Sequence, residues 1–141
     1  MAEPGDAEPL KSIRLDQQED HEGAALTEQK LRYLGVKGTA KLAEVLKFNT
    51  TVVELSIDGH RMCDDGAAAL AEMLRRNSAL QTLSAANNKV HASGAALIAE
   101  ALQTNTRLTD ISLRDNSIGD QGQGNLFLAA FALAGVSLLR E

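Results

Sequence analysis

Three asparagines, Asn49, Asn77 and Asn105, recur with a 28-residue period, and each begins a stretch with the same apolar pattern. Counted from each asparagine, apolar side chains fall three, six, eight, thirteen and twenty-one residues on, and a glycine falls seventeen residues on. A repeat of this period predicts a solenoid, in which each unit packs only against its neighbours and completes their cores. Such folds present extended surfaces to partners more often than catalytic pockets.

Each unit divides into a strand half and a helix half. The first half reads apolar-x-x-apolar-x-apolar, so that its last two apolar side chains share one face of a strand. The second half reads Gly-x-x-x-Leu-Ala-x-x-Leu in the first complete unit, which is the spacing of one face of an amphipathic helix. We therefore predict an α/β solenoid with a curved parallel sheet on the concave side and helices on the convex side.

Two features of the turns lead to local predictions. Asp65, Ser93 and Asp120 lie just before the predicted helices and suit N-caps. The asparagine that opens each unit follows a helix end, where we expect it in the left-handed conformation that terminates helices.

The last complete unit reads L-x-x-I-x-L-x-x-N-x-I-G-D-x-G over residues 108–122. This pattern resembles the ribonuclease-inhibitor type of leucine-rich repeat, well over residues 49–132 and partly over 34–48. The resemblance implies that the side chains of Asn88 and Asn116 bond the turn backbone and form a ladder. His60 takes that position in the first complete unit, so we expect a looser turn there.

A length of 141 residues indicates one domain with a modest core. Within it, the repeat divides the chain into an acidic disordered leader, an irregular N-terminal unit and three regular repeats followed by the start of another; these cover residues 1–9, 10–48 and 49–141. The irregular unit is lengthened by about 14 residues, because its helix fits the repeat but its strand lies too early. We predict its strand near 10–16, an extra turn or helix near 22–34 and its regular helix near 38–47.

At the other end, Val136 and Leu139 fall on strand positions of a further unit, and the sequence stops at Glu141 without a polar cap. An uncovered terminal strand invites association. Two alternatives follow: the chain is a short or truncated part of a longer array, or its end is covered by a partner or by self-association with a second copy.

Charge and composition limit the classes of partner and the compartment that we expect for this protein. The net charge is −5, and residues 1–30 carry eight acids against three bases, so there is no basic stripe for nucleic acid. The uncharged run 126–139 has 14 residues, short of the roughly 20 that cross a bilayer. Cys63 is the only cysteine, which excludes an internal disulfide and favours a reducing compartment. We expect a cytoplasmic protein without a membrane or nucleic-acid partner.

Polar residues alternate with the buried positions of each strand, five, seven and nine residues after each asparagine. They are expected to line the concave face in parallel rows and to contact a partner protein. The alternative is that they are ordinary solvated strand positions. The predicted contact residues are Glu54, Ser56, Asp58, Thr82, Ser84, Asp110, Ser112 and Arg114.

The sequence contains no convincing catalytic or metal-binding pattern. His21, His60 and His91 lack metal-ligand spacing, and no histidine is placed to activate the repeated serines. The glycines near residue 120 lack the Lys-Ser/Thr of a phosphate loop. We therefore predict no enzyme activity, no metal and no cofactor.

The leading functional hypothesis is a non-enzymatic protein-binding or scaffold module that acts through the concave face. Residues 46–107 also resemble the repeat domain of tropomodulins and leiomodins, in L-x-x-N-T at 46–50, S-I-x-G at 56–59, A-L-A-E-M-L at 69–74 and E-A-L-Q-x-N-T at 100–106. That resemblance implies regulation of the slow-growing, pointed end of actin filaments. Regulation of an enzyme such as a GTPase is a third hypothesis, with Asn87, Asn88 and Arg114 as polar turn residues.

Overall fold

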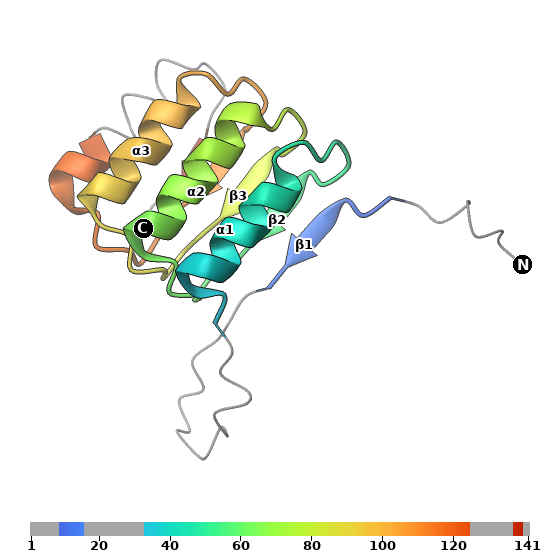
Figure 1. The fold of residues 1–141 in the computed structure, drawn as a ribbon. Coiled ribbons are helices and arrows are strands. Elements are labelled where there is room, and N and C mark those ends of the chain that lie inside the picture. Colours follow the sequence, from blue (N-terminus) through green and yellow to red (C-terminus); the bar gives the residue numbers. More distant parts are fainter. Residues whose placement is uncertain (1–8, 16–32, 125–136, 140–141) are drawn as a thin grey trace, which may run out of the picture.

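The computed structural model describes residues 9–15, 33–124 and 137–139. One parallel sheet with strand order β1-β2-β3-β4-β5 carries the helices on one side, and Figure 1 shows α1, α2 and α3 lying side by side. This confirms the predicted leucine-rich-repeat solenoid. The strands are β1 (Ser12–Arg14), β2 (Glu54–Ser56), β3 (Thr82–Ser84), β4 (Asp110–Ser112) and β5 (Ser137–Leu139); the helices are α1 (Gly35–Leu46), α2 (Cys63–Arg76) and α3 (Ala92–Leu102), and residues 119–124 are also helical.

The core lies between the sheet and the helices. In the register of the sheet, Leu55 stands opposite Leu83, and Leu83 stands opposite Ile111. All three are fully buried, as are Leu70 and Ile98 on the helices that face them. The constant period of the repeat therefore places equivalent side chains in continuous layers, so that each unit shares its buried surface with the next. None of the helices in the described part of the chain is long and apolar enough to cross a membrane.

The N-terminal unit is longer than the others. Ser12 pairs with Glu54, a separation of 42 in sequence, whereas Glu54 pairs with Thr82 after one regular period. The difference matches the lengthening predicted for this unit. α1 begins at Gly35, slightly before the predicted helix near 38–47. The predicted leader at 1–9 and the extra turn or helix near 22–34 lie almost wholly outside the described residues.

The register of β5 corrects one prediction. Leu138, not Leu139, stands opposite Ile111, while Leu139 stands opposite Ser112. The partner of Asp110 is Ser137, one position earlier in the chain than the regular period would place it. The regular period of 28 residues therefore misplaces the pairing of this strand by one residue. Val136 lies outside the described residues.

The predicted N-caps are also wrong. α2 begins at Cys63 and α3 at Ala92, so Asp65 and Ser93 lie inside the first turns, and residue 120 likewise follows a helix start at 119. The start of α3 is bonded instead by Asp64 of the preceding unit. One carboxylate oxygen of Asp64 accepts the His91 N–H at 2.7 Å, and the other accepts the Ser93 hydroxyl at 2.8 Å. The anion also suits the positive end of the helix dipole.

The asparagines that open the units do not take the predicted left-handed conformation. Asn77 is extended, with φ −76° and ψ 132°. Its Oδ1 accepts the N–H groups of Ala79 and Leu80, and its Nδ2 donates to the Leu46 carbonyl at 2.6 Å and, more weakly, to the Asn49 carbonyl at 3.2 Å. The side chain therefore holds its own turn and ties it to the preceding unit. Residues in the left-handed conformation occur instead in the turn that follows each strand, at Gly59, Asn87 and Asp115.

That other turn contains the ladder implied by the leucine-rich-repeat resemblance. Asn88 Oδ1 accepts the His60 N–H at 2.8 Å, and its Nδ2 donates to the Ile57 carbonyl at 2.8 Å. Asn116 makes the equivalent bonds to Asn88 and Ala85. Each rung satisfies backbone groups of the unit before it, which would otherwise be buried without partners.

His60 continues this ladder, so the expectation of a looser turn is wrong. The side chain is buried, its Nδ1 accepts the Leu34 N–H at 3.0 Å, and its Nε2 donates to the Leu15 carbonyl. These two roles require a neutral ring that carries its proton on Nε2. Leu15 and Leu34 flank the lengthened segment of the N-terminal unit. The His60 side chain therefore forms hydrogen bonds at both ends of that segment.

The glycine in each helix lets adjacent helices approach closely. A Cβ atom added to Gly94 would lie 2.5 Å from Asp64 Oδ1 and 3.0 Å from Ala67 Cβ, both on α2. A Cβ on Gly122 would likewise be 3.4 Å from Ala95 Cβ of α3. This face of α2, of α3 and of the helix at residues 119–124 therefore packs against the helix of the unit before it.

Asn77→Ala tests the asparagine turn. The substitution removes four hydrogen bonds and leaves buried backbone groups unsatisfied, so we expect a loss of about 2–4 kcal/mol in the free energy of unfolding. Urea denaturation of both proteins measures it. Ser78→Ala, at an exposed neighbour, is the control and should stay within about 0.5 kcal/mol of wild type. Equal losses in the two variants would contradict the role of Asn77.

The Asp64 cap predicts a dependence of stability on pH. Partial burial raises the pKa of this carboxyl, but bonds from the His91 N–H and the Ser93 hydroxyl outweigh it, and the net pKa lies below the ordinary 3.8. A lowered pKa contributes stability that is present above the unfolded-state value and is lost as pH falls through the folded-state value.

Asp64→Asn should therefore destabilise the fold near neutral pH, and the difference from wild type should shrink at about pH 3. Urea unfolding at both pH values measures this difference. Asp65→Asn, in the same helical turn, is the matched control and should show little change. A penalty for Asp64→Asn that does not depend on pH would argue against the charged cap.

Candidate functional site

The outward faces of β2, β3 and β4 form two polar rows across the sheet. Glu54, Thr82 and Asp110 stand opposite one another in register. Ser56, Ser84 and Ser112 form the second row, two residues further along each strand. Strand side chains alternate between faces, so both rows lie on the side of the sheet away from the helices, where the repeat predicts them.

The exposure of these side chains varies along each row. Glu54 is exposed, whereas Thr82 and Asp110 are half-buried. Ser56 and Ser84 are also half-buried, but Ser112 is only 7% exposed. The prediction that Ser112 offers a contact surface is therefore not met.

The third predicted row follows the ends of the strands. Asp58 reaches into the next unit, where one carboxylate oxygen accepts both the Ser84 hydroxyl and the Ala86 N–H at 2.8 Å. This carboxylate therefore helps to shape the concave surface as well as to line it. Arg114 is exposed at the equivalent position two units on.

A hollow of about 260 Å³ lies on this surface over β1, β2 and β3. Five of the predicted contact residues line it, while Asp110, Ser112 and Arg114 do not. The lining residues are Ser12, Ile13, Arg14, Glu54, Leu55, Ser56, Asp58, Thr82 and Ser84.

The sequence reasoning missed the contribution of β1 to this hollow. Ser12 and Arg14 alternate with Ile13, which packs against the core, and this alternation was the available signal. Only the register Ser12 to Glu54 and Arg14 to Ser56 shows that both join the polar rows. Arg14 brings a cation to a surface whose other charged lining residues, Glu54 and Asp58, are acidic.

The groups that line the hollow suit hydrogen bonding and charge pairing. Besides Ile13 and Leu55, they comprise hydroxyls, carboxylates and one guanidinium, with no histidine or cysteine among them. In the parts of the chain that the structure describes, no group of three His, Cys, Asp or Glu side chains is arranged to hold a metal ion. The surface is therefore suited to recognising side chains of another molecule.

No protein-family model matches this sequence, and no curated protein matches it either. Solved structures do match. Actin-binding site 2 of leiomodin-1 aligns with a TM-score of 0.72 and 18% identity, over 93% of this chain and 70% of that one. The C-terminal domain of tropomodulin from Caenorhabditis elegans aligns with a TM-score of 0.70 and 12% identity, over 92% and 71%.

At these identities the comparison establishes the fold. The chain is a short leucine-rich-repeat array of the kind found in the tropomodulin and leiomodin repeat domains. This agrees with the likeness of residues 46–107 to those domains at the level of sequence.

Proposed function

We propose that this chain is a non-enzymatic protein-binding module whose contact surface is the concave face, centred on the hollow over β1 to β3. The observation that carries the proposal is the alignment of polar side chains from three strands around one depression. Polar groups that converge on one depression are typical of binding sites. The lone Cys63 thiol favours a cytoplasmic setting.

The charged side chains of the concave face indicate which side chains a partner would place against it. Glu54 and Asp110 stand in one row and are not part of the Asp58 bonding arrangement. Lysine or arginine side chains of a partner can pair with them. Complementary charges of this kind chiefly set specificity and association rate.

A second candidate is regulation of actin filaments. It is supported by two solved structures, since leiomodin-1 actin-binding site 2 and a tropomodulin C-terminal domain share the fold over more than nine-tenths of this chain. The sequence likeness at residues 46–107 points in the same direction. This candidate specifies the partner of the proposed module and leaves the concave face as its contact surface.

The double variant Glu54→Lys plus Asp110→Lys tests the concave face. Both side chains lie in one row, so reversing their charge should repel a cationic partner. In a quantitative pull-down, the amount of specifically bound protein should therefore fall. Glu44→Lys plus Glu72→Lys makes the same change in net charge on the exposed helix surface and should retain them. Identical sets of bound proteins for wild type and the concave variant would contradict the proposal.

The actin candidate predicts slower elongation at pointed ends. Filaments capped at the opposite end should elongate progressively more slowly as the purified chain is added, measured by fluorescence of labelled actin. The concave double variant should act more weakly than the helix-surface control. An unchanged elongation rate at saturating protein would remove actin as the partner while leaving the pull-down test of the binding module intact.

A further inference from the structure

The first layer of the array, β1 and α1, exposes apolar side chains at positions that are buried in later units. Leu10 is 60% exposed, whereas Val52, the equivalent residue before the neighbouring strand β2, is 2% exposed. Leu15 is 41% exposed, while its counterpart Ile57 is fully buried. The hydrophobic core is therefore open at this end of the described array.

The helix of this layer shows the same difference. Val45 of α1 is 72% exposed, whereas the equivalent Met73 and Ala101, one and two repeats later, are fully buried. Leu42 is only partly buried, whereas its equivalent Leu70 is fully buried.

These positions belong to the face that packs against a preceding helix. Gly66 and Gly94 lie on that face, because a Cβ on Gly66 would meet Thr39 of α1 and a Cβ on Gly94 would meet Ala67 of α2. Met73 follows Gly66 by two helical turns along the same stripe. The corresponding stripe of α1 is Gly38, Leu42 and Val45, and no described helix covers it.

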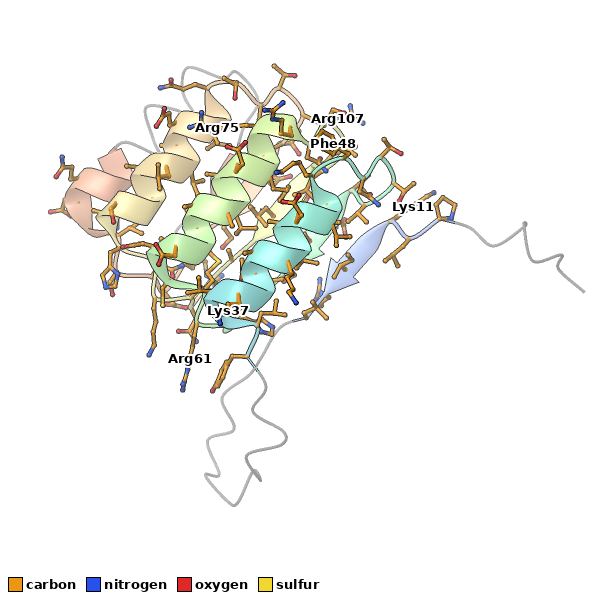
Figure 2. The ribbon with its side chains drawn as sticks, in the orientation of Figure 1. Lys11, Lys37, Phe48, Arg61, Arg75 and Arg107 are labelled. Atoms are coloured by element: carbon orange, nitrogen blue, oxygen red, sulfur yellow. The ribbon has the colours of Figure 1, made fainter. Side chains whose placement is uncertain are left out.

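Phe48 extends this stripe beyond the end of α1 and is 74% exposed. The equivalent positions in the next two units hold Arg76 and Thr104. Figure 2 shows Phe48 at the end of α1 and Lys11 at the start of β1, on the same side of the molecule. We call the surface formed by Leu10, Leu42, Val45 and Phe48 the N-terminal flank.

Cations border the N-terminal flank. Lys11, Lys37 and Lys41 are exposed, and none of them forms an ion pair with another described residue. Lys37 and Lys41 stand where the next unit has Asp65 and Ala69, so the positive charge belongs to this layer alone. A second copy of the chain on the same surface would bring these lysines face to face, which like-charge repulsion opposes.

We propose that the N-terminal flank binds an acidic amphipathic helix of a partner protein. The helix would lie along α1 as α1 itself lies along α2, with apolar side chains on Leu42, Val45 and Phe48. Its flanking Asp and Glu side chains would lie beside Lys37 and Lys41. Helices bind apolar grooves in this manner through residues spaced i, i+4 and i+7. This surface is separate from the concave face.

A displayed library of helical peptides of about 18 residues, varied at apolar and charged positions, supplies the probe. Selection on the full chain should enrich peptides that combine an apolar stripe with Asp and Glu beside it. An enriched peptide is then synthesised with a fluorophore, and anisotropy measures its affinity for wild type and variants.

Val45→Glu should weaken binding by about tenfold or more, and Lys37→Glu plus Lys41→Glu should do the same. Both variants change exposed side chains, and circular dichroism checks that they remain folded. The concave variant Glu54→Lys plus Asp110→Lys is the matched control and should bind the peptide as wild type does. This control separates the test of the N-terminal flank from the test of the concave face.

Three results would overturn the proposal: no enrichment of amphipathic peptides, enrichment of basic ones, or equal affinity for wild type and Val45→Glu. A fourth is a dimer of the wild-type chain in sedimentation velocity that Val45→Glu converts to monomer. That result would show a second copy on the N-terminal flank.

Discussion

Hydrogen bonds between successive units hold the two turns of this array in place. Asn77 donates to the Leu46 carbonyl in the turn after a helix, and Asn88 donates to the Ile57 carbonyl in the turn after a strand. Turns expose backbone groups that the strand and helix ladders do not satisfy, and here the next unit bonds them while the aliphatic layers exclude water. A unit separated from its neighbours would lose both the bonds and much of its buried surface. The strands can consequently be very short and still keep the regular register from β2 to β4.

That register also determines which surfaces are available for binding. It brings Arg14, Glu54 and Ser84, which are far apart in the sequence, around one hollow on the concave face. It equally determines that Val45 is exposed whereas Met73 is buried, because only Met73 has a described helix before it. The two proposed surfaces thus have different physical origins. The concave face is a repeated pattern of polar positions, and the N-terminal flank is the open end of a repeated core.

Much of this could be predicted from the chain alone because solenoid contacts are local in the repeat. The rows through Glu54 and Ser56 follow from the period of the repeat, and β1 was located from its apolar alternation. The predictions that were wrong concern contacts between neighbouring units or a strand that departs from the 28-residue period. Asp64 caps the helix of the following unit, and His60 replaces an asparagine by reaching further with its ring. Neither interaction leaves a local signature, since each depends on the distance between neighbouring units.

The sequence by itself determined the fold, its strand and helix faces and the polar rows, because aliphatic spacing fixes which side chains must leave water. Only the tertiary structure decided which members of those rows are accessible. Ser112 is buried, while Glu54 remains exposed. The tertiary structure also decided that β5 pairs one position earlier in the chain than the repeat predicts. Exposure and register depend on what lies on both sides of a residue in space, and a repeat pattern specifies only the residue's own place within its unit.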